Sequence, residues 1–163
     1  MMIKEYTKND CYEILYIIND AAERYKNVIP DNCWKEPYMP ESELLEVFEE
    51  GVKMFGYVQD DKLISVMGFQ EIMEVILIRH AYTLTKYQGK GTGSTLLRYL
   101  LDRNKDSRLL VGTWSDAKWA IKFYEKFGFI LHEKKESNSL LEKYWNIQPK
   151  QIENSVVLEK IRI

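Results

Sequence analysis

The spacing of apolar residues changes along the chain, and each spacing predicts a different secondary structure. Residues 2–6 are expected to form a short first strand. A helix that Asp10 can cap should follow and end near Tyr25. It is predicted by apolar residues three and four positions apart, namely Ile14, Leu15, Ile18, Ala21 and Ala22. A second helix is expected over residues 41–48, with Gly51 as its stop.

From Met54 the apolar period becomes two, which indicates β-strands. The expected strands of this meander cover residues 53–59, 63–70 and 74–85, with turns at Asp60-Asp61 and around residues 71–74. Further on, helices are predicted over residues 94–103, 116–127 and 139–145, and strands over 109–114, 129–134 and 156–161. This order predicts one domain over residues 1–163, of mixed α/β class and with a mixed sheet.

Composition narrows the class of protein. Hydrophobic residues make up 45% and charged residues 29% of the 163 residues, as in ordinary globular proteins. The net charge of −2 gives no overall attraction to nucleic acid or to an anionic membrane, so we expect neither as a partner. The first ten residues are charged where a signal peptide is apolar, and no apolar run could span a membrane, so a cytoplasmic location is expected. Two cysteines are too few for a disulfide framework or a metal site, and no metal is expected.

A glycine-rich loop connects the meander to the next predicted helix and reads Gln88-Gly89-Lys90-Gly91-Thr92-Gly93. Glycine permits positive φ and lets backbone N–H groups approach a ligand. The free N–H groups of a helix N-terminus favour binding of a phosphate group. The alternative is a tight turn that binds nothing.

The spacing of this loop excludes two phosphate-binding motifs. A P-loop needs a glycine, four intervening residues and then Gly-Lys-Ser/Thr, and no such string is present. The dinucleotide fingerprint GxGxxG needs a third glycine at position 94, which is Ser94. The residues alone leave open which phosphate compound binds.

The loop resembles the Q/R-x-x-G-x-G/A signature of the GNAT superfamily of N-acetyltransferases. The resemblance implies acetyl-CoA as cofactor. It implies that Gln88 opens a cradle in which backbone N–H groups hold the pyrophosphate, from Gly89, Lys90, Gly91, Thr92, Gly93 and Ser94. It also implies that Tyr82, Thr83 and Leu84 run beside the pantetheine arm, where a backbone N–H polarises the acetyl carbonyl. The implied fold has a central, mixed but mostly antiparallel sheet that is splayed in a V and flanked by helices.

Residues 116–129, DAKWAIKFYEKFGF, resemble a second segment of that superfamily, A-I-x-F-Y-x-x-x-G-F. The matching residues are Ala120, Ile121, Phe123, Tyr124, Gly128 and Phe129. Small side chains at Ala117 and Ala120 would let the cofactor lie against this helix, and Phe123 is assigned to the same cofactor-binding set. The sequence departs from the family at Ala117, where many members have an Asn that contacts the cofactor.

The resemblance implies that Tyr124 is the general acid that protonates the departing thiolate; the alternative is a core tyrosine. The general base is less defined. His80 titrates in a suitable range, but strand alternation turns it away from the site unless a bulge intervenes. Glu36, Glu74 or a chain of waters are the other candidates.

The acceptor side is expected to include Trp34, Glu36 and Tyr38, where a carboxylate and aromatic faces could hold a cation. Residues 29–39 and 143–159 extend the resemblance to a bacterial and archaeal subgroup, so it covers nearly the whole chain. The expected activity is acetyl transfer to a primary amine of a small molecule or peptide by direct attack on the thioester. Protein N-termini, polyamines, amino acids and aminoglycosides all remain open as acceptors. A homodimer is common among the relatives, and the alternative function is a noncatalytic acyl-CoA sensor or scaffold.

Overall fold

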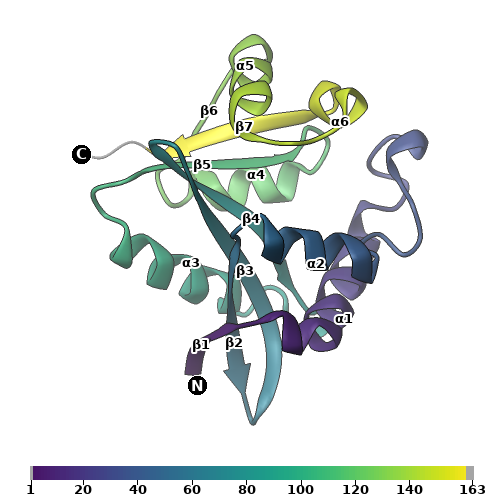
Figure 1. The fold of residues 1–163 in the computed structure, drawn as a ribbon, viewed down its shortest axis with the longest axis vertical. Coiled ribbons are helices and arrows are strands. Elements are labelled where there is room, and N and C mark those ends of the chain that lie inside the picture. Colours follow the sequence, from purple (N-terminus) through teal and green to yellow (C-terminus); the bar gives the residue numbers. More distant parts are fainter. Residues whose placement is uncertain (1, 161–163) are drawn as a thin grey trace. The chain divides into compact units, whose positions relative to one another are not determined.

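The computed structural model describes residues 2–160 (Figure 1). These residues divide into two compact units that alternate along the chain. Unit one contains residues 2–24, 36–71 and 78–105. Unit two contains residues 25–35, 72–77 and 106–160. None of the helices within residues 2–160 has the length and the apolar character to cross a membrane.

Unit one combines helices with the first strands of the sheet. Its elements are β1 (Met2–Tyr6), α1 (Cys11–Ala22), α2 (Glu41–Glu49), β2 (Lys53–Gln59), β3 (Lys62–Ile72), the end of β4 (Val75–Thr83) and α3 (Thr92–Arg103). The strand order is β1-β2-β3-β4, with β1–β2 and β2–β3 antiparallel. Asp60 and Asp61 form the β2–β3 turn with φ of 51° and 60°, and Gly51 follows α2 with φ of 90°. The turn and the stop predicted from the sequence are therefore confirmed.

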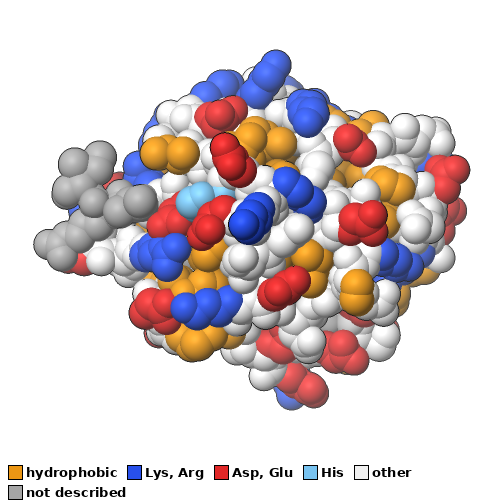
Figure 2. Space-filling view, turned by 90° about the horizontal axis from the view of Figure 1, so that it is seen from above, with side chains coloured by type: hydrophobic (Ala, Val, Ile, Leu, Met, Phe, Trp, Pro, Cys, Tyr) orange, Lys and Arg blue, Asp and Glu red, His pale blue; other side chains and the backbone are white. Residues whose placement is uncertain are grey.

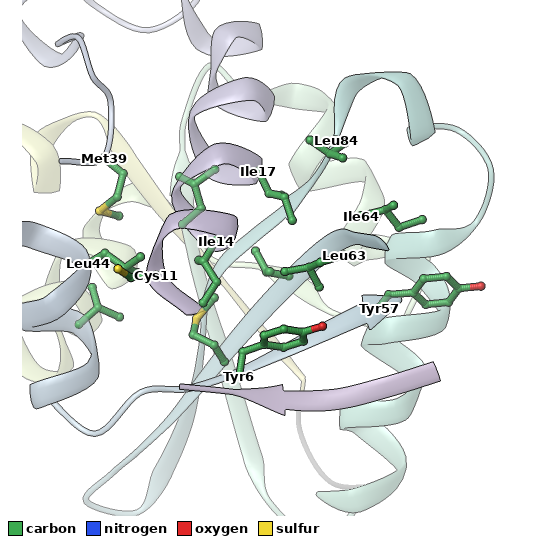
Figure 3. Close-up of a cluster of buried hydrophobic side chains, with 14 of the residues drawn as sticks. Tyr6, Cys11, Ile14, Ile17, Met39, Leu44, Tyr57, Leu63, Ile64 and Leu84 are labelled. Carbon is green, nitrogen blue, oxygen red and sulfur yellow. The ribbon is translucent and has the colours of Figure 1, made fainter. Parts of the chain in front are cut away.

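The core of unit one lies where α1 and α2 pack on the strands. Ile14 and Ile17 of α1 extend toward Leu44 of α2 and toward Leu63 and Ile64 of β3 (Figure 3). These side chains are at most 6% exposed. Of the apolar positions predicted for α1, Ile14, Ile18, Ala21 and Ala22 are buried and Leu15 is half-buried, while Ile17 is buried although it was not in the predicted set.

The predicted side-chain cap of α1 is wrong. Asp10 is the N-cap residue, but its side chain makes no capping hydrogen bond to α1. Its Oδ2 instead accepts the Thr7 backbone N–H at 2.9 Å and closes the preceding 3₁₀ turn. The Asp10 carboxylate, which was predicted to cap α1, therefore caps the preceding 3₁₀ helix Lys8–Asp10.

Unit two contains the remaining strands and the C-terminal helices. Its elements are the start of β4, then β5 (Arg108–Trp114), α4 (Lys118–Glu125), β6 (Ile130–Leu131), α5 (Lys134–Tyr144), α6 (Pro149–Glu153) and β7 (Ser155–Lys160). The strand order is β4-β5-β7-β6, and β7 is antiparallel to both β5 and β6. Val75, Leu77 and Leu110 pack with Leu141 and Val157 in its core. The protein is therefore of mixed α/β class with a mostly antiparallel arrangement of strands, as predicted.

Several boundaries differ from the predicted ones. The strand expected over residues 129–134 is limited to β6, and α5 begins five residues before the predicted helix. The helices predicted over 94–103 and 116–127 are α3, which begins at Thr92, and the shorter α4. Helix α6 was not predicted, and Ile161 lies outside the described residues.

Charged side chains of both signs are interspersed over the face shown in Figure 2. No extended area of basic side chains is visible among the described residues on that face.

Candidate functional site

The glycine loop of unit one presents bare backbone. Gly89 and Gly91 have φ of 75° and 82°, in the left-handed region that favours glycine. A Cβ added at either position would meet no other heavy atom within 4 Å. Glycine is therefore favoured here by backbone conformation, and the space beside these residues is open to a ligand.

The loop ends at the N-terminus of α3, where backbone donors are available. Gly91 is the N-cap residue and provides no side-chain cap, and the first helical N–H to find a carbonyl is that of Thr95, bonded to the Gly91 oxygen at 3.0 Å. The N–H groups of residues 92–94 precede this bond, so the helix itself supplies them with no acceptor. With the positive end of the helix dipole, this arrangement fits a phosphate group.

Hydrogen bonds within unit one hold the approach to the loop. Gln88 Nε2 donates to the Thr83 carbonyl at 2.9 Å, so this side chain closes the loop on itself. The Thr85 N–H donates to Asp20 Oδ2 at 2.8 Å, and the buried Leu84 donates its N–H to the Ile64 carbonyl. Lys90 is exposed, and its Nζ lies 5.7 Å from the ring centroid of Tyr87.

Ser65 holds the end of β4 in place, and the sequence analysis did not predict this role. Its hydroxyl donates to the Tyr82 carbonyl at 3.1 Å and lies 2.8 Å from Thr83 Oγ1. Ser65 is 1% exposed and therefore fixes the end of β4 from within unit one. A serine in an otherwise apolar strand, Leu-Ile-Ser-Val-Met, was the available signal.

His80 lies within β4 with φ of 57°, so regular side-chain alternation cannot be assumed across it. Its Nε2 is buried and has no hydrogen-bond partner among the described residues. Burial, and after it the positive charge of Arg79, lowers the pKa of His80 to about 3. The imidazole is therefore neutral at pH 7. It is a weak proton acceptor, because a general base works best with a pKa near the working pH.

This depressed pKa has a consequence for stability. The pKa of His80 is lower in the folded protein than the value of about 6.5 expected in the unfolded chain, so the unfolded chain binds a proton first as the pH falls. The contribution of the neutral His80 to the free energy of unfolding is therefore fully present above pH 6.5 and is lost as the pH falls toward the pKa of the folded protein. We expect the free energy of unfolding to fall by about 1 kcal/mol between pH 7 and pH 5.5 from this group alone.

Urea denaturation of wild type and His80→Asn at the two pH values measures this difference. The variant should lose about 1 kcal/mol less than wild type. His132→Asn, a change at the other histidine, should leave the His80 component in place. Equal losses in wild type and His80→Asn would show that His80 is not kept neutral by folding.

In unit two, α4 carries the predicted acid. Tyr124 is 4% exposed, and its ring packs against Phe123 and Phe129 at centroid distances of 5.1 and 5.5 Å. Burial, followed by the negative charge that Tyr25 carries when ionised, raises the pKa of Tyr124 well above the usual value of a phenol. The hydroxyl is therefore fully protonated at neutral pH. Of the other predicted cofactor contacts on this segment, Ala117 is fully buried, and Ala120 and Phe123 are half-buried.

The three predicted acceptor residues do not belong to one unit. Trp34 is half-buried and belongs to unit two, whereas Glu36 and Tyr38 belong to unit one. Tyr38 packs against the unit-one core, and Glu36 is exposed.

Glu74, another candidate base, has partners of its own in unit two. It accepts a hydrogen bond from the Tyr144 hydroxyl, and Lys143 Nζ lies 3.7 Å from its carboxylate. The Tyr144 hydrogen bond is the main cause of the lowered pKa of Glu74. A lowered pKa makes the carboxylate a weaker base.

A comparison with family models decides the family. The model of the acetyltransferase (GNAT) domain matches residues 4–141. The chain belongs to the GNAT acetyltransferase family. A GNAT acetyltransferase uses acetyl-CoA, as predicted, and the open backbone of Gly89 and Gly91 fits its phosphates.

Solved structures show the same GNAT fold at low sequence identity. The smu.2055 protein from Streptococcus mutans UA159 superposes with a TM-score of 0.74 and 15% identity, with all of both chains covered. The PaiA N-acetyltransferase from Thermoplasma acidophilum, in complex with coenzyme A, gives 0.70 and 16%, with 99% of each chain covered. The ribosomal-protein-S18-alanine N-acetyltransferase from Escherichia coli gives 0.67 and 17%, covering 97% of this GNAT chain and 91% of its own. A search of the curated proteins found no match.

Proposed function

We propose that this GNAT acetyltransferase is an N-acetyltransferase that moves the acetyl group to a primary amine of a small molecule or peptide by direct attack. The observation that carries the proposal is the match of residues 4–141 to the GNAT acetyltransferase model, within which Tyr124 is a buried phenol on α4. Two structural neighbours support an amine acceptor, since both are N-acetyltransferases and one is named for ribosomal-protein alanine. The acceptor class includes both protein N-termini and small amines.

The proposal assigns cofactor binding to the glycine loop and proton donation to one side chain. Acetyl-CoA supplies the activated acetyl group. The backbone N–H groups of residues 89–94 bind its phosphates, and residues 82–84 lie beside its arm. Tyr124 donates its proton to the departing sulfur, so that a neutral thiol leaves.

The incoming amine must lose a proton before it attacks. His80 is not the base that accepts this proton in the proposal, because its pKa is about 3. We propose that water accepts the proton that the amine loses. His80 remains in the site as a neutral imidazole whose buried Nε2 is available for a hydrogen bond. Neutral imidazoles serve other enzymes as hydrogen-bond donors to carbonyl oxygens.

A thermal-shift measurement tests the choice of cofactor. Acetyl-CoA at a hundred times its Kd stabilises the native state by about 2.7 kcal/mol, which corresponds to roughly 5–10 °C in Tm for a domain of this size. NAD and ATP should give no comparable shift, because the loop matches neither of their motifs. A shift with either of them and none with acetyl-CoA would reject the assignment.

Release of free thiol from acetyl-CoA then tests the reaction. The amine panel should contain an alanine-first peptide, a polyamine, free amino acids and an aminoglycoside. At least one should give steady thiol release and an N-acetylated product by mass spectrometry. Tight binding of acetyl-CoA with no turnover on any amine would favour the noncatalytic sensor instead.

A further inference from the structure

The last turn of α1 carries two polar residues between buried apolar ones. Asn19 and Asp20 lie between Ile18 and Ala21, which are 0% and 7% exposed, so this turn is fixed by its packing. Successive residues of an α-helix are turned by about 100° from each other, so the two polar side chains leave the helix in different directions. Each of them makes hydrogen bonds to backbone that lies far away in the sequence.

Asn19 holds the segment that precedes α2. Its Nδ2 donates to the Met39 carbonyl at 3.0 Å, and its Oδ1 accepts the Met39 N–H at 2.8 Å. A carboxamide contains both donors and an acceptor, so it can satisfy both backbone groups of one residue at once. The Met39 side chain is 6% exposed in the core of unit one (Figure 3). Met39 is therefore fixed both by its backbone and by its side chain.

Met39 stands next to two of the residues expected on the acceptor side. Tyr38 directly precedes it and packs against the unit-one core, and Glu36 is exposed three residues before it. On the other side of Met39, the Pro40 carbonyl accepts the first backbone N–H groups of α2. The position of the Glu36 carboxylate and of the Tyr38 ring therefore depends on the bonds that Asn19 makes to Met39.

Asp20 holds the start of the approach to the glycine loop. Its Oδ2 accepts the Thr85 N–H at 2.8 Å, and its backbone carbonyl accepts from Thr85 Oγ1 at 3.5 Å. Thr85 begins the 3₁₀ helix Thr85–Tyr87, which leads directly into the glycine loop. One helical turn of unit one is thus bonded to the expected acceptor segment through Asn19 and to the loop through Asp20.

We propose that Asn19 and Asp20 are positioning residues for the two substrates: Asn19 holds the segment that receives the amine, and Asp20 holds the start of the loop that binds acetyl-CoA. The proposal rests on the function proposed above and on Glu36 and Tyr38 as acceptor residues. Each residue acts through the backbone that it holds. Because both extend from the same packed turn of α1, they keep the acceptor segment and the loop in a fixed relation within unit one.

The Asn19 role is tested by the kinetics of the amine. Asn19→Leu keeps a side chain of similar size and removes both hydrogen bonds to Met39. The KM for the best amine should rise about tenfold, an effect of the size expected from lost hydrogen bonds. The kcat and the Kd for acetyl-CoA should not change. Asn9→Leu, at an exposed asparagine before α1, is the matched control and should keep the wild-type KM.

The assays are run well below the Tm of each variant, so that a loss of stability alone would not change the KM. An unchanged KM for the amine in folded Asn19→Leu would overturn the Asn19 role.

The Asp20 role is tested by calorimetry with acetyl-CoA and no amine. Asp20→Ala removes the acceptor of the Thr85 N–H and should weaken binding about fivefold. Asp20→Asn keeps an oxygen at that position without the charge and should restore the wild-type affinity. Glu13→Ala, at an exposed carboxylate two turns earlier on α1, should bind acetyl-CoA as wild type does. Wild-type affinity in Asp20→Ala would overturn the Asp20 role, and so would equal weakening in Asp20→Asn.

The two measurements separate this proposal from the function on which it rests. A wild type that binds acetyl-CoA and acetylates no amine would overturn that function and the Asn19 role together, while calorimetry would still decide the Asp20 role. Amine turnover in wild type with an unchanged KM in Asn19→Leu would overturn the Asn19 role alone. If both variants changed both parameters, unit one would be loosened as a whole, and the assignment of one substrate to each residue would be wrong.

Discussion

Tyr124→Phe is expected to lower kcat tenfold to a hundredfold while the affinity for acetyl-CoA stays nearly the same. General acid catalysis contributes roughly 10² to 10⁴ in rate, and a thiolate leaves without a proton more easily than most groups, which favours the low end. The ring of Tyr124 packs against Phe123 and Phe129, and phenylalanine preserves those contacts. Steady-state kinetics with the best amine, together with calorimetry for acetyl-CoA, measure the two quantities.

The folded state of this variant must be established first, by its Tm and by its binding of acetyl-CoA. Raising the pH supplies a further check. At higher pH a larger fraction of the amine is already unprotonated and needs no base, whereas the departing thiolate still needs an acid. The deficit of Tyr124→Phe should therefore persist at pH 9. Full turnover in the variant, with chemistry rate-limiting, would make Tyr124 a core tyrosine only.

Gly91→Asp should weaken acetyl-CoA binding at least tenfold, which is about 1.4 kcal/mol, with the fold kept. Gly91 has φ of 82° and is the N-cap of α3. Aspartate tolerates the left-handed region better than most residues. At an N-cap it accepts hydrogen bonds from the N–H groups of the first turn. The new carboxylate would thus occupy the donors offered to phosphate and would also repel it.

Two matched variants separate charge from backbone strain. Gly91→Asn adds a side chain of the same shape without the charge, so its loss of affinity should be smaller. Gly51→Asp introduces the same residue at another glycine with φ of 90° and open space around a Cβ, and acetyl-CoA affinity should be unchanged. Isothermal calorimetry on all three measures the result. Unchanged affinity in a folded Gly91→Asp would reject the loop as the phosphate site.

The local patterns predicted what depends on local structure. The apolar residues over 53–83 predicted β2, β3 and β4 closely, although the burial of β3 and β4 does not alternate: residues 63–68 and 75–78 are buried without interruption. The start of α5 was missed because its first turn is polar and its buried position is Ser137, which accepts the Val157 N–H at 2.9 Å. An apolar period cannot detect a helical turn whose buried side chain is a hydroxyl, although it detected the following turns, which bury Leu140, Leu141 and Tyr144.

The functional residues show the same division. The glycine loop and Tyr124 could be proposed from the sequence because they belong to continuous segments with a characteristic spacing. Ser65 could not, because it donates its hydrogen bond to the carbonyl of a residue far away in the sequence, Tyr82. The neutral state of His80 was also hidden, since burial sets its pKa and the sequence alone gives only the ordinary value.

The alternation of the two units along the chain restricts where the chain can be cut and whether one unit can be exchanged between proteins. Strand β4 begins in unit two, where Val75 and Leu77 join its core, and continues into unit one. A single cut anywhere between residues 24 and 106 therefore leaves at least one unit without part of its own chain. Neither unit could be exchanged between proteins as a continuous genetic cassette. Insertions and fusions would have to be accepted at surface turns or at the ends of the whole chain.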